Sequence, residues 1–289
     1  MTVGFVGFGE AAYCIAQGLR QEGVERILSY DVMQNDPKMK ESFEQKCADC
    51  GAKMMASAAD VCREAELVIS AVPSKYAVSV ARSTLDGVHS GLLFLDVSTA
   101  TPAEKREIAD MVEEKGALCA DGAMLGTLLK DKHQVPILLS GNGAAAIKEK
   151  MDPYHMRLEV VEGVSGVATG IKFIRSIAAK GLSCLLIEAL QAGQRFGVEQ
   201  IIVDSFLDSY GPGFIEIVDG YVSGAVLHAD RREHEMQNVV DFLRSESLPF
   251  TMAEASRQKL KWLHDNKVKD HFNTGVPRNW VGVLDGWQL

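Results

Sequence analysis

The stretch TVGFVGFGEAA at residues 2–12 decides the fold, because a short apolar strand pattern leads directly into a run of spaced small residues. Its second half is a GxGxxA motif. We expect the first glycine to make the strand-to-helix turn, the second to let the backbone approach a pyrophosphate, and the alanine to allow close helix–strand packing. The free N–H groups that open the helix would bind the anion. The predicted cofactor-binding residues of this turn are Gly7, Phe8, Gly9, Glu10, Ala11 and Ala12.

A regular alternation of strand and helix patterns follows this turn. Residues 10–22 carry apolar residues at helical spacing and end at Gly23, a typical helix terminator. Several of the strands are continuous apolar runs, as expected of strands buried on both faces of a parallel sheet. The sequence therefore predicts an α/β, Rossmann-type, doubly wound parallel sheet. The predicted strands are Thr2–Val6, Arg26–Tyr30, Glu66–Val72, Gly91–Val97, Ala117–Cys119 and Val135–Ser140.

The character of the chain changes after Gly163. Residues 165–195 form one long helical pattern, and further helical patterns continue to about Asn266 without a convincing strand. We therefore predict two domains, a dinucleotide-binding domain at residues 1–162 and an all-helical substrate and dimerisation domain at residues 163–289.

Composition limits the classes of partner. The 289 residues carry a net charge of −9, which argues against nucleic acid or an anionic membrane surface as the main partner. The chain has no apolar run of the length that spans a bilayer. Its six cysteines follow no disulfide spacing, so a reducing, cytoplasmic setting is expected. Cys47 and Cys50 form a lone CxxC without a second pair, and we predict no metal site.

Asp31 ends the second predicted strand, at about the spacing expected for the acidic residue that binds the adenosine ribose hydroxyls. Its carboxylate would repel a 2′-phosphate, so NAD is the preferred cofactor and NADP the alternative. An ordinary strand-end aspartate on the surface is the competing interpretation.

Four blocks in order resemble the β-hydroxyacid dehydrogenase family, which includes 3-hydroxyisobutyrate and 6-phosphogluconate dehydrogenases. They are GFVGFG at residues 4–9, AVP at 71–73, DVST at 96–99 with Pro102, and the glycine-rich segment from Gly166 to Lys172. The chain is similar to a divergent branch of phosphogluconate-dehydrogenase-like proteins.

The resemblance implies a Rossmann domain, a helical second domain that often forms a dimer interface, and oxidation of a hydroxyl β to a carboxylate. It places Val72 and Pro73 beside the cofactor. It also places Ser98 near both the nicotinamide and the substrate, and makes Lys172 the acid/base residue. A small anionic molecule is then the expected substrate, and a homodimer or higher homo-oligomer the expected assembly.

Three departures separate the chain from the family pattern. Residues 121–127 read DGAMLGT where the family usually has DAPVSGG, so Leu125 replaces a serine that contacts the substrate carboxylate. Ser176 replaces the asparagine four residues after the lysine. The usual Lys-Asp-Leu is absent, and an Arg-Arg-Glu lies roughly there. The substrate-contact candidates that remain are Met124, Gly126, Arg231 and Arg232.

The lysine and the serine one turn later carry the predicted chemistry. Lys172 lies within the apolar stretch GIKFI, where burial of an ammonium costs free energy unless the charge is paired or has a function. A lysine whose stem lies along the domain edge is the competing interpretation. Ser176 shares its helix face and is a candidate to hydrogen-bond the substrate, or else a small packing residue. Lys180, a further turn along, is expected to be solvated. Arg231 and Arg232 are either carboxylate partners or part of an ordinary charged helix face.

The leading hypothesis is an NAD(P)-dependent oxidoreductase that interconverts a small β-hydroxy acid, or a related sugar acid, and its carbonyl. Lys172, Ser98 and Ser176 would act in catalysis. An imine or ketone reductase on the same fold is one alternative. A nucleotide-binding sensor without turnover is another, motivated by Leu125 and Ser176.

Overall fold

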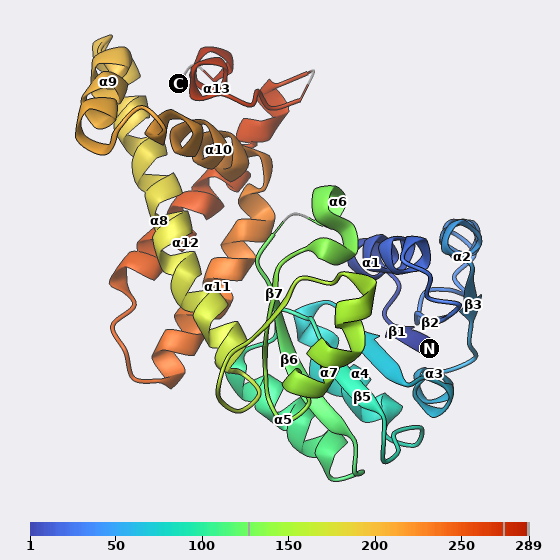
Figure 1. The fold of residues 1–289 in the computed structure, drawn as a ribbon. Helices are drawn as coiled ribbons and strands as arrows, with labels where there is room; N and C mark the ends of the chain where they lie inside the picture. The colour runs from blue at the N-terminus through green and yellow to red at the C-terminus, as the bar shows by residue number, and fades with distance from the viewer. Residues whose placement is uncertain (127, 274, 288–289) are drawn as a thin grey trace. The chain divides into compact units, whose positions relative to one another are not determined.

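The computed structural model describes residues 1–126, 128–273 and 275–287. Within them, one compact unit, Met1–Lys172, is built on an eight-stranded sheet of order β3-β2-β1-β4-β5-β6-β7-β8 (Figure 1). Its strands are β1 (Thr2–Val6), β2 (Arg26–Tyr30), β3 (Ala52–Met54), β4 (Leu67–Ser70), β5 (Leu93–Asp96), β6 (Leu118–Met124), β7 (Ile137–Ser140) and β8 (Leu158–Val160).

All six predicted strands are present, and the sheet differs from the prediction at its edges. β3 and β8 are three-residue strands with exposed positions, so neither produces a continuous apolar run. β7 runs antiparallel to β6, pairing Leu139 with Gly122, so the sheet is mostly rather than wholly parallel. The predicted fold class is confirmed.

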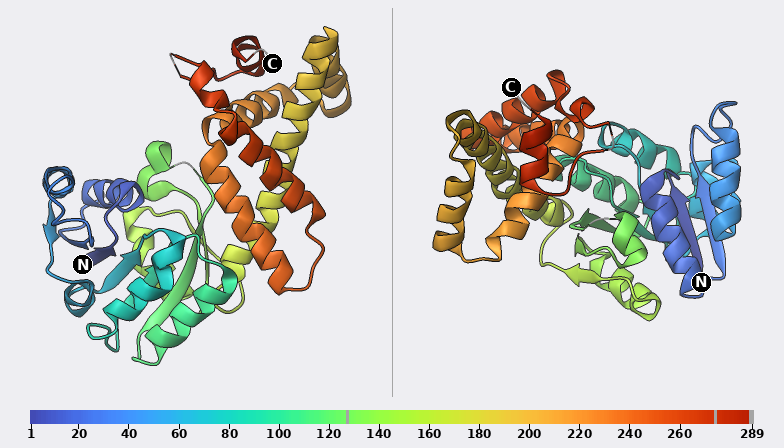
Figure 2. Two further views of the ribbon diagram at one scale, coloured as in Figure 1. Left: turned by 180° about the vertical axis from the view of Figure 1, so that it is seen from behind. Right: turned by 90° about the horizontal axis from the view of Figure 1, so that it is seen from above.

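Helices lie against both faces of this sheet (Figure 1 and Figure 2). Successive residues of a strand point to opposite faces, so β4 contributes Ile69 to one apolar cluster with Ile15, and Val68 to another with Ile108. The helices of this unit are α1 (Glu10–Gln21), α2 (Lys40–Cys50), α3 (Ala58–Glu64), η1 (Ser74–Tyr76), α4 (Ala77–Thr84), α5 (Pro102–Glu113), α6 (Leu128–Asp131), η2 (Lys132–Gln134), α7 (Ala144–Met151) and η3 (Asp152–Tyr154).

The strand order reverses beside β1, because β2 and β3 lie on one side of it and β4 to β8 on the other. Ligands of such sheets bind outside the carboxyl ends of the strands at this switch point. The glycine turn follows β1, and Ala71 follows β4. The topology therefore places the GxGxxA motif where a ligand is expected.

The second compact unit, Phe173–Leu289, is entirely helical over its described residues. Its core contains apolar side chains of four helices, for example Leu190, Val222, Val240 and Leu260. α11 and α12 lie side by side within it (Figure 2). The helices are α8 (Val167–Phe196), which begins in the first unit, α9 (Glu199–Tyr210), α10 (Phe214–Leu227), α11 (Ala229–Ser245), α12 (Thr251–Asp265), η4 (Val268–His271) and α13 (Trp280–Gly286). No helix among the described residues is long and apolar enough to cross a membrane.

The division between the two units lies inside α8, after Lys172. The sequence places the change of character earlier, near Glu162, where the strand patterns end. The first turn of α8 stays with the sheet because its backbone is hydrogen-bonded to Asp121 at Gly166 and Thr169. A tertiary contact of this kind leaves no signal in helical periodicity.

Candidate cofactor and active site

The two glycines of the turn have different structural requirements. Gly7 has φ +80, and a Cβ there would lie 2.5 Å from Val72 Cγ1 and 2.8 Å from the Ala71 carbonyl oxygen, so only glycine is accommodated. A Cβ on Gly9 would meet no described atom within 4 Å. Gly9 is the N-cap of α1, and as a glycine it has no side chain to bond the opening amides. The turn therefore leaves open space beside the opening amides of α1, which suits a pyrophosphate.

Asp31 is held at this turn by backbone hydrogen bonds. The amide of Phe8 donates to Asp31 Oδ2 at 2.8 Å, and that of Met33 donates to Oδ1 at 2.9 Å. The Asp31 carboxylate, just beyond β2, is thereby oriented beside the glycine motif, although 23 residues separate it from Phe8. This position suits an acceptor for ribose hydroxyls, so the residues present fit a dinucleotide.

Val72 and Pro73 follow β4 at the neighbouring strand end. Val72 is half-buried and lies against the Gly7 position, whereas Pro73 is exposed and precedes η1. Both therefore lie next to the turn, in the part of the sheet edge where the sequence predicts cofactor contacts.

Ser98 lies just beyond β5 and is 6% exposed. Its hydroxyl donates to Asp96 Oδ2 at 2.8 Å, and its amide approaches Asp96 Oδ1 at 3.3 Å. Because the serine hydrogen is directed to Asp96, a ligand meets the Ser98 oxygen as an acceptor. Sequence reasoning did not anticipate this direction.

A buried ion cluster that sequence reasoning missed lies beneath these residues. Lys105 Nζ is 2.9 Å from Asp96 Oδ2 and 3.2 Å from Asp121 Oδ1, and all three side chains are at most 2% exposed. Burial alone would lower the pKa of Lys105, but the two carboxylates outweigh it and raise that pKa. The sequence could have indicated it, because Lys105 has the helical spacing that places it on the same face of α5 as the buried residues Ile108 and Val112.

Asp121 connects this cluster to the helix that carries Lys172. Its Oδ2 accepts from the amides of Gly166 at 3.1 Å and Thr169 at 2.8 Å, and its Oδ1 accepts from the Thr169 hydroxyl at 2.6 Å. Lys105 therefore joins two carboxylates, one bonded to Ser98 and the other to the first turn of α8. Lys172 follows one turn later and is half-buried.

Ser176 and Lys180 form a short network in the helical unit. Lys180 Nζ donates to Ser176 Oγ at 2.9 Å and is 2.9 Å from Glu235 Oε2 of α11. The side chain of Lys180 is 16% exposed, so the expectation of a solvated lysine is wrong. Ser176 is buried and receives the ammonium's hydrogen bond, which leaves its own hydrogen for another acceptor.

The predicted substrate contacts fall in separate parts of the chain. Met124 ends β6 half-buried, and Leu125 beyond it donates its amide hydrogen to the Pro136 carbonyl at 2.8 Å. Gly126 is exposed, and a Cβ there would lie 2.8 Å from Pro136 Cδ. Thr127 lies outside the described residues.

Arg231 and Arg232 belong to the helical unit and differ in exposure. The Arg231 side chain is 69% exposed and its Nε lies 3.7 Å from Glu235 Oε1. Arg232 is half-buried, and its guanidinium occupies the space beside Gly224, where a Cβ would lie 2.6 Å from Nη2. Arg231 is therefore the more accessible to a ligand.

The described residues contain no group of three or more His, Cys, Asp or Glu side chains placed to hold a metal ion. All six cysteines are buried and free. Burial raises the pKa of the thiols of Cys47 and Cys50, so the thiolate that a metal or a redox partner needs is disfavoured.

Family models match both units of the chain. The model described as "NADP oxidoreductase coenzyme F420-dependent" matches residues 2–100, and a domain of unknown function, DUF1932, matches residues 194–263. Each model covers less than half of the chain, and the two matches lie in the sheet unit and in the helical unit.

Known proteins and solved structures are similar to further parts of the chain. Human mitochondrial 3-hydroxyisobutyrate dehydrogenase is 34% identical over 128 residues, which cover 43% of this chain and 36% of that protein. A conserved hypothetical protein from Sinorhizobium meliloti 1021 is 28% identical with a TM-score of 0.82, covering 99% of this chain and 95% of the other. The 3-hydroxyisobutyrate dehydrogenase of Mycobacterium tuberculosis shares the fold at 15% identity, with a TM-score of 0.76 over 91% of this chain and 94% of that one. The resemblance to the β-hydroxyacid dehydrogenases is confirmed.

Proposed function

We propose that the chain interconverts a small β-hydroxy acid, or a related sugar acid, and its carbonyl compound by hydride transfer, with Lys172 as acid/base. The observation that carries the proposal is the buried Asp96–Lys105–Asp121 cluster. It fixes Ser98 and the first turn of the Lys172 helix relative to the same sheet edge. Such fixed geometry is what proton and hydride transfer require.

The turn and Asp31 are proposed to hold the cofactor. Gly7, Gly9 and the opening amides of α1 would bind the pyrophosphate, and Asp31 would accept from the ribose hydroxyls, which favours NAD over NADP. Val72 and Pro73 would border the nicotinamide half. When bound, NAD(P) supplies the hydride acceptor or donor at its nicotinamide.

The chain's own residues would then handle the hydroxyl proton. As a neutral amine, Lys172 would take the proton of the substrate hydroxyl at Nζ during oxidation and return it during reduction. Ser98 Oγ, whose hydrogen goes to Asp96, would accept from a second donor of the substrate or cofactor, because the single hydrogen of that hydroxyl goes to Lys172. Ser176 would donate to a substrate oxygen, because its own oxygen already accepts from Lys180. Met124, Gly126 and Arg231 or Arg232 stay proposed substrate contacts.

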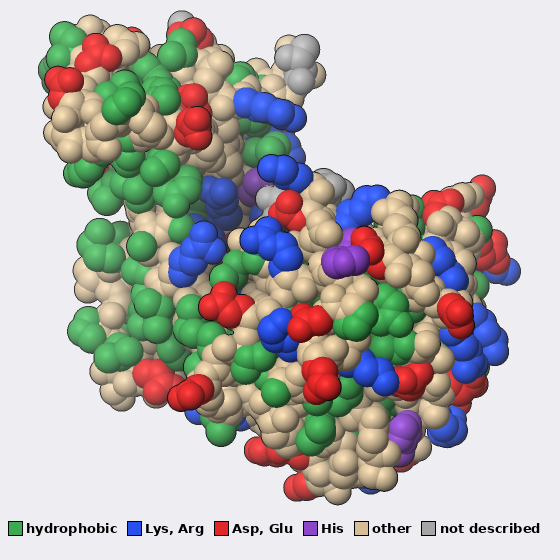
Figure 3. All heavy atoms as spheres, viewed as in Figure 1, with side chains coloured by type: hydrophobic (Ala, Val, Ile, Leu, Met, Phe, Trp, Pro, Cys, Tyr) green, Lys and Arg blue, Asp and Glu red, His purple; other side chains and the backbone are tan. Residues whose placement is uncertain are grey.

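We also propose a homodimer formed through the helical unit and a cytoplasmic location. Large apolar side chains are exposed on α8 and α9, including Leu185 at 56%, Phe196 at 82% and Ile201 at 65%. Figure 3 shows hydrophobic side chains gathered on the helical unit. Contiguous exposed apolar surface typically marks an interaction site. The six buried, free cysteines suit a reducing compartment.

The test is turnover with NAD and NADP against 3-hydroxyisobutyrate, L-serine and sugar acids, followed by reduced-cofactor absorbance. Lys172→Met should lower kcat by about 10²–10⁴-fold while cofactor binding is kept. Arg175→Met, which removes an exposed cation from the same helix, should retain activity. Unchanged turnover in Lys172→Met removes that residue from the mechanism. Tight cofactor binding without turnover on any substrate favours the sensor instead.

A further inference from the structure

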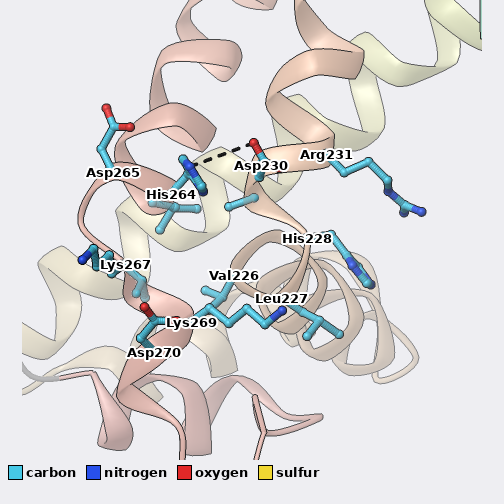
Figure 4. Close-up of a pocket in the computed structure, with 13 residues that line it drawn as sticks. Val226, Leu227, His228, Asp230, Arg231, His264, Asp265, Lys267, Lys269 and Asp270 are labelled. Carbon is cyan, nitrogen blue, oxygen red and sulfur yellow. Dashed lines mark ion pairs between the residues drawn. The ribbon is translucent and has the colours of Figure 1, made fainter. Parts of the chain in front are cut away.

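The helical unit contains a pocket of its own at the corner between α10 and α11 (Figure 4). Its volume is about 640 Å³, and residues of α10, α11, α12 and η4 line it. This volume is within the range of small-molecule sites. All of its lining residues belong to the unit Phe173–Leu289.

Three side chains capable of positive charge approach one side of this pocket from different elements. They are His228 between α10 and α11, Arg231 of α11 and Lys269 of η4. Figure 4 shows the Arg231 and His228 side chains extending to the side toward which the Lys269 ammonium points. A group placed on that side would lie near side chains of α11, of η4 and of the α10–α11 connection.

The electrostatic environment of His228 indicates local positive charge. Partial burial lowers the pKa of His228, and the neighbouring cations Arg231, Arg232 and Lys269 lower it further, against a smaller opposing effect of Glu235. Glu235 is also paired with Lys180 at 2.9 Å. His228 therefore lies among cations more than among carboxylates, on a chain whose net charge is −9.

The pocket also has three carboxylates, Asp230, Asp265 and Asp270. Asp265 is paired with Lys261 at 2.8 Å, and Asp230 lies 3.5 Å from His234 and 4.0 Å from His264. In Figure 4, Asp265 and Asp270 lie on the side away from Arg231 and His228, as does Lys267. The side on which Arg231 and His228 extend therefore lies away from Asp265 and Asp270, whereas Asp230 is next to Arg231 on α11.

We propose that this pocket binds an oxyanion group of a small ligand, a phosphate or a carboxylate, through Arg231, Lys269 and His228. Arg231 supplies a planar pair of donors, and Lys269 supplies a flexible ammonium. The imidazole of His228 donates a further hydrogen bond. Because Arg231 is also a proposed substrate contact, the proposal is tested by the binding of simple anions without cofactor rather than by turnover.

The experiment titrates the full chain with inorganic phosphate and, separately, with malonate, against sodium chloride at matched ionic strength. The readouts are calorimetry and the NMR signals of the His228 imidazole, assigned with His228→Gln. Arg231→Gln and Lys269→Gln should each weaken binding by about 10-fold, because each removes a charge-assisted hydrogen bond. Arg244→Gln is the matched control, since it removes an exposed cation from the same helix outside the pocket.

Saturable binding of phosphate alone assigns the pocket to phosphate groups, and saturable binding of malonate alone assigns it to carboxylates. Either result, lost in the pocket variants and kept in Arg244→Gln, supports the proposal. It is overturned when neither anion changes the His228 signals more than chloride does. Equal weakening in Arg231→Gln and Arg244→Gln overturns it as well.

Discussion

Replacing Lys105 by methionine is the sharpest test of the buried cluster. Methionine approximates the length of the lysine side chain and removes its charge, which leaves Asp96 and Asp121 buried without their shared cation. Removing one partner of a buried ion pair costs about 3–5 kcal/mol. In a unit of this size, 1 kcal/mol corresponds to roughly 2–4 °C, so Tm should fall by about 6–20 °C.

Thermal and urea denaturation, followed by circular dichroism, measure this loss. Arg106→Met is the matched control, because Arg106 is the exposed neighbour on the same helix and should change stability by less than about 0.5 kcal/mol. Adding Asp121→Asn to Lys105→Met should cost less than the sum of the two single changes, because the second substitution removes an uncompensated charge. Equal stability of Lys105→Met and Arg106→Met would refute the reasoning.

The pKa shift of Lys105 gives the same prediction a pH dependence. Its pKa is raised in the folded chain, so the protonated lysine stabilises the fold fully at pH values below its unfolded pKa of about 10.4. The contribution is lost as pH rises from there through the folded pKa. Wild type and Lys105→Met should therefore differ fully at neutral pH and converge in strong alkali.

Two further predictions concern Asp31 and His133. Asp31→Asn should weaken NAD binding by roughly 10–100-fold, because it removes charge-assisted hydrogen bonds to the ribose. NADP binding should weaken by less, because the substitution also removes the repulsion of the 2′-phosphate. Equilibrium titration measures both affinities, and an equal loss for the two cofactors contradicts the assignment. Burial lowers the pKa of His133 in the folded chain. The contribution of His133 to the free energy of unfolding should therefore be complete above its unfolded pKa of about 6.5. Below that pH the free energy of unfolding should fall by about 1.4 kcal/mol per pH unit, until the folded pKa is reached. Urea denaturation between pH 5 and pH 8 tests this, and an unchanged slope in His133→Leu removes His133 as its cause.

Local signals were enough to predict the features that short stretches of chain determine. The GxGxxA turn, the six longer strands and the helical second unit each follow from spacing within a few residues. Asp31 was found because the motif itself specifies its distance from the glycines. The edge strands β3 and β8 were missed because three residues with exposed positions carry too little pattern.

The hydrogen bonds and ion pairs of the site depend on tertiary contacts that no local sequence pattern encodes. Lys105 forms ion pairs with Asp96 and Asp121 only when α5 packs against the sheet. Asp121 accepts a hydrogen bond from Thr169, which is 48 residues away in the chain. Lys180 forms an ion pair with Glu235 of another helix. For this reason the prediction that Lys180 is solvated was wrong. The sequence identified residues that can donate, accept or transfer a proton. The tertiary structure determined the hydrogen-bond partners of those residues.

Equilibrium binding of NADH and NADPH to wild type and Gly9→Val, followed by nicotinamide fluorescence, tests the account most directly. A Cβ at Gly9 meets open space, so the variant should fold with an unchanged Tm while its side chain occupies the room left for the pyrophosphate. We expect saturable binding to wild type and a loss of at least 100-fold in the variant, about 2.7 kcal/mol or more of binding free energy. Absence of binding to wild type, or equal binding to both proteins, would contradict it.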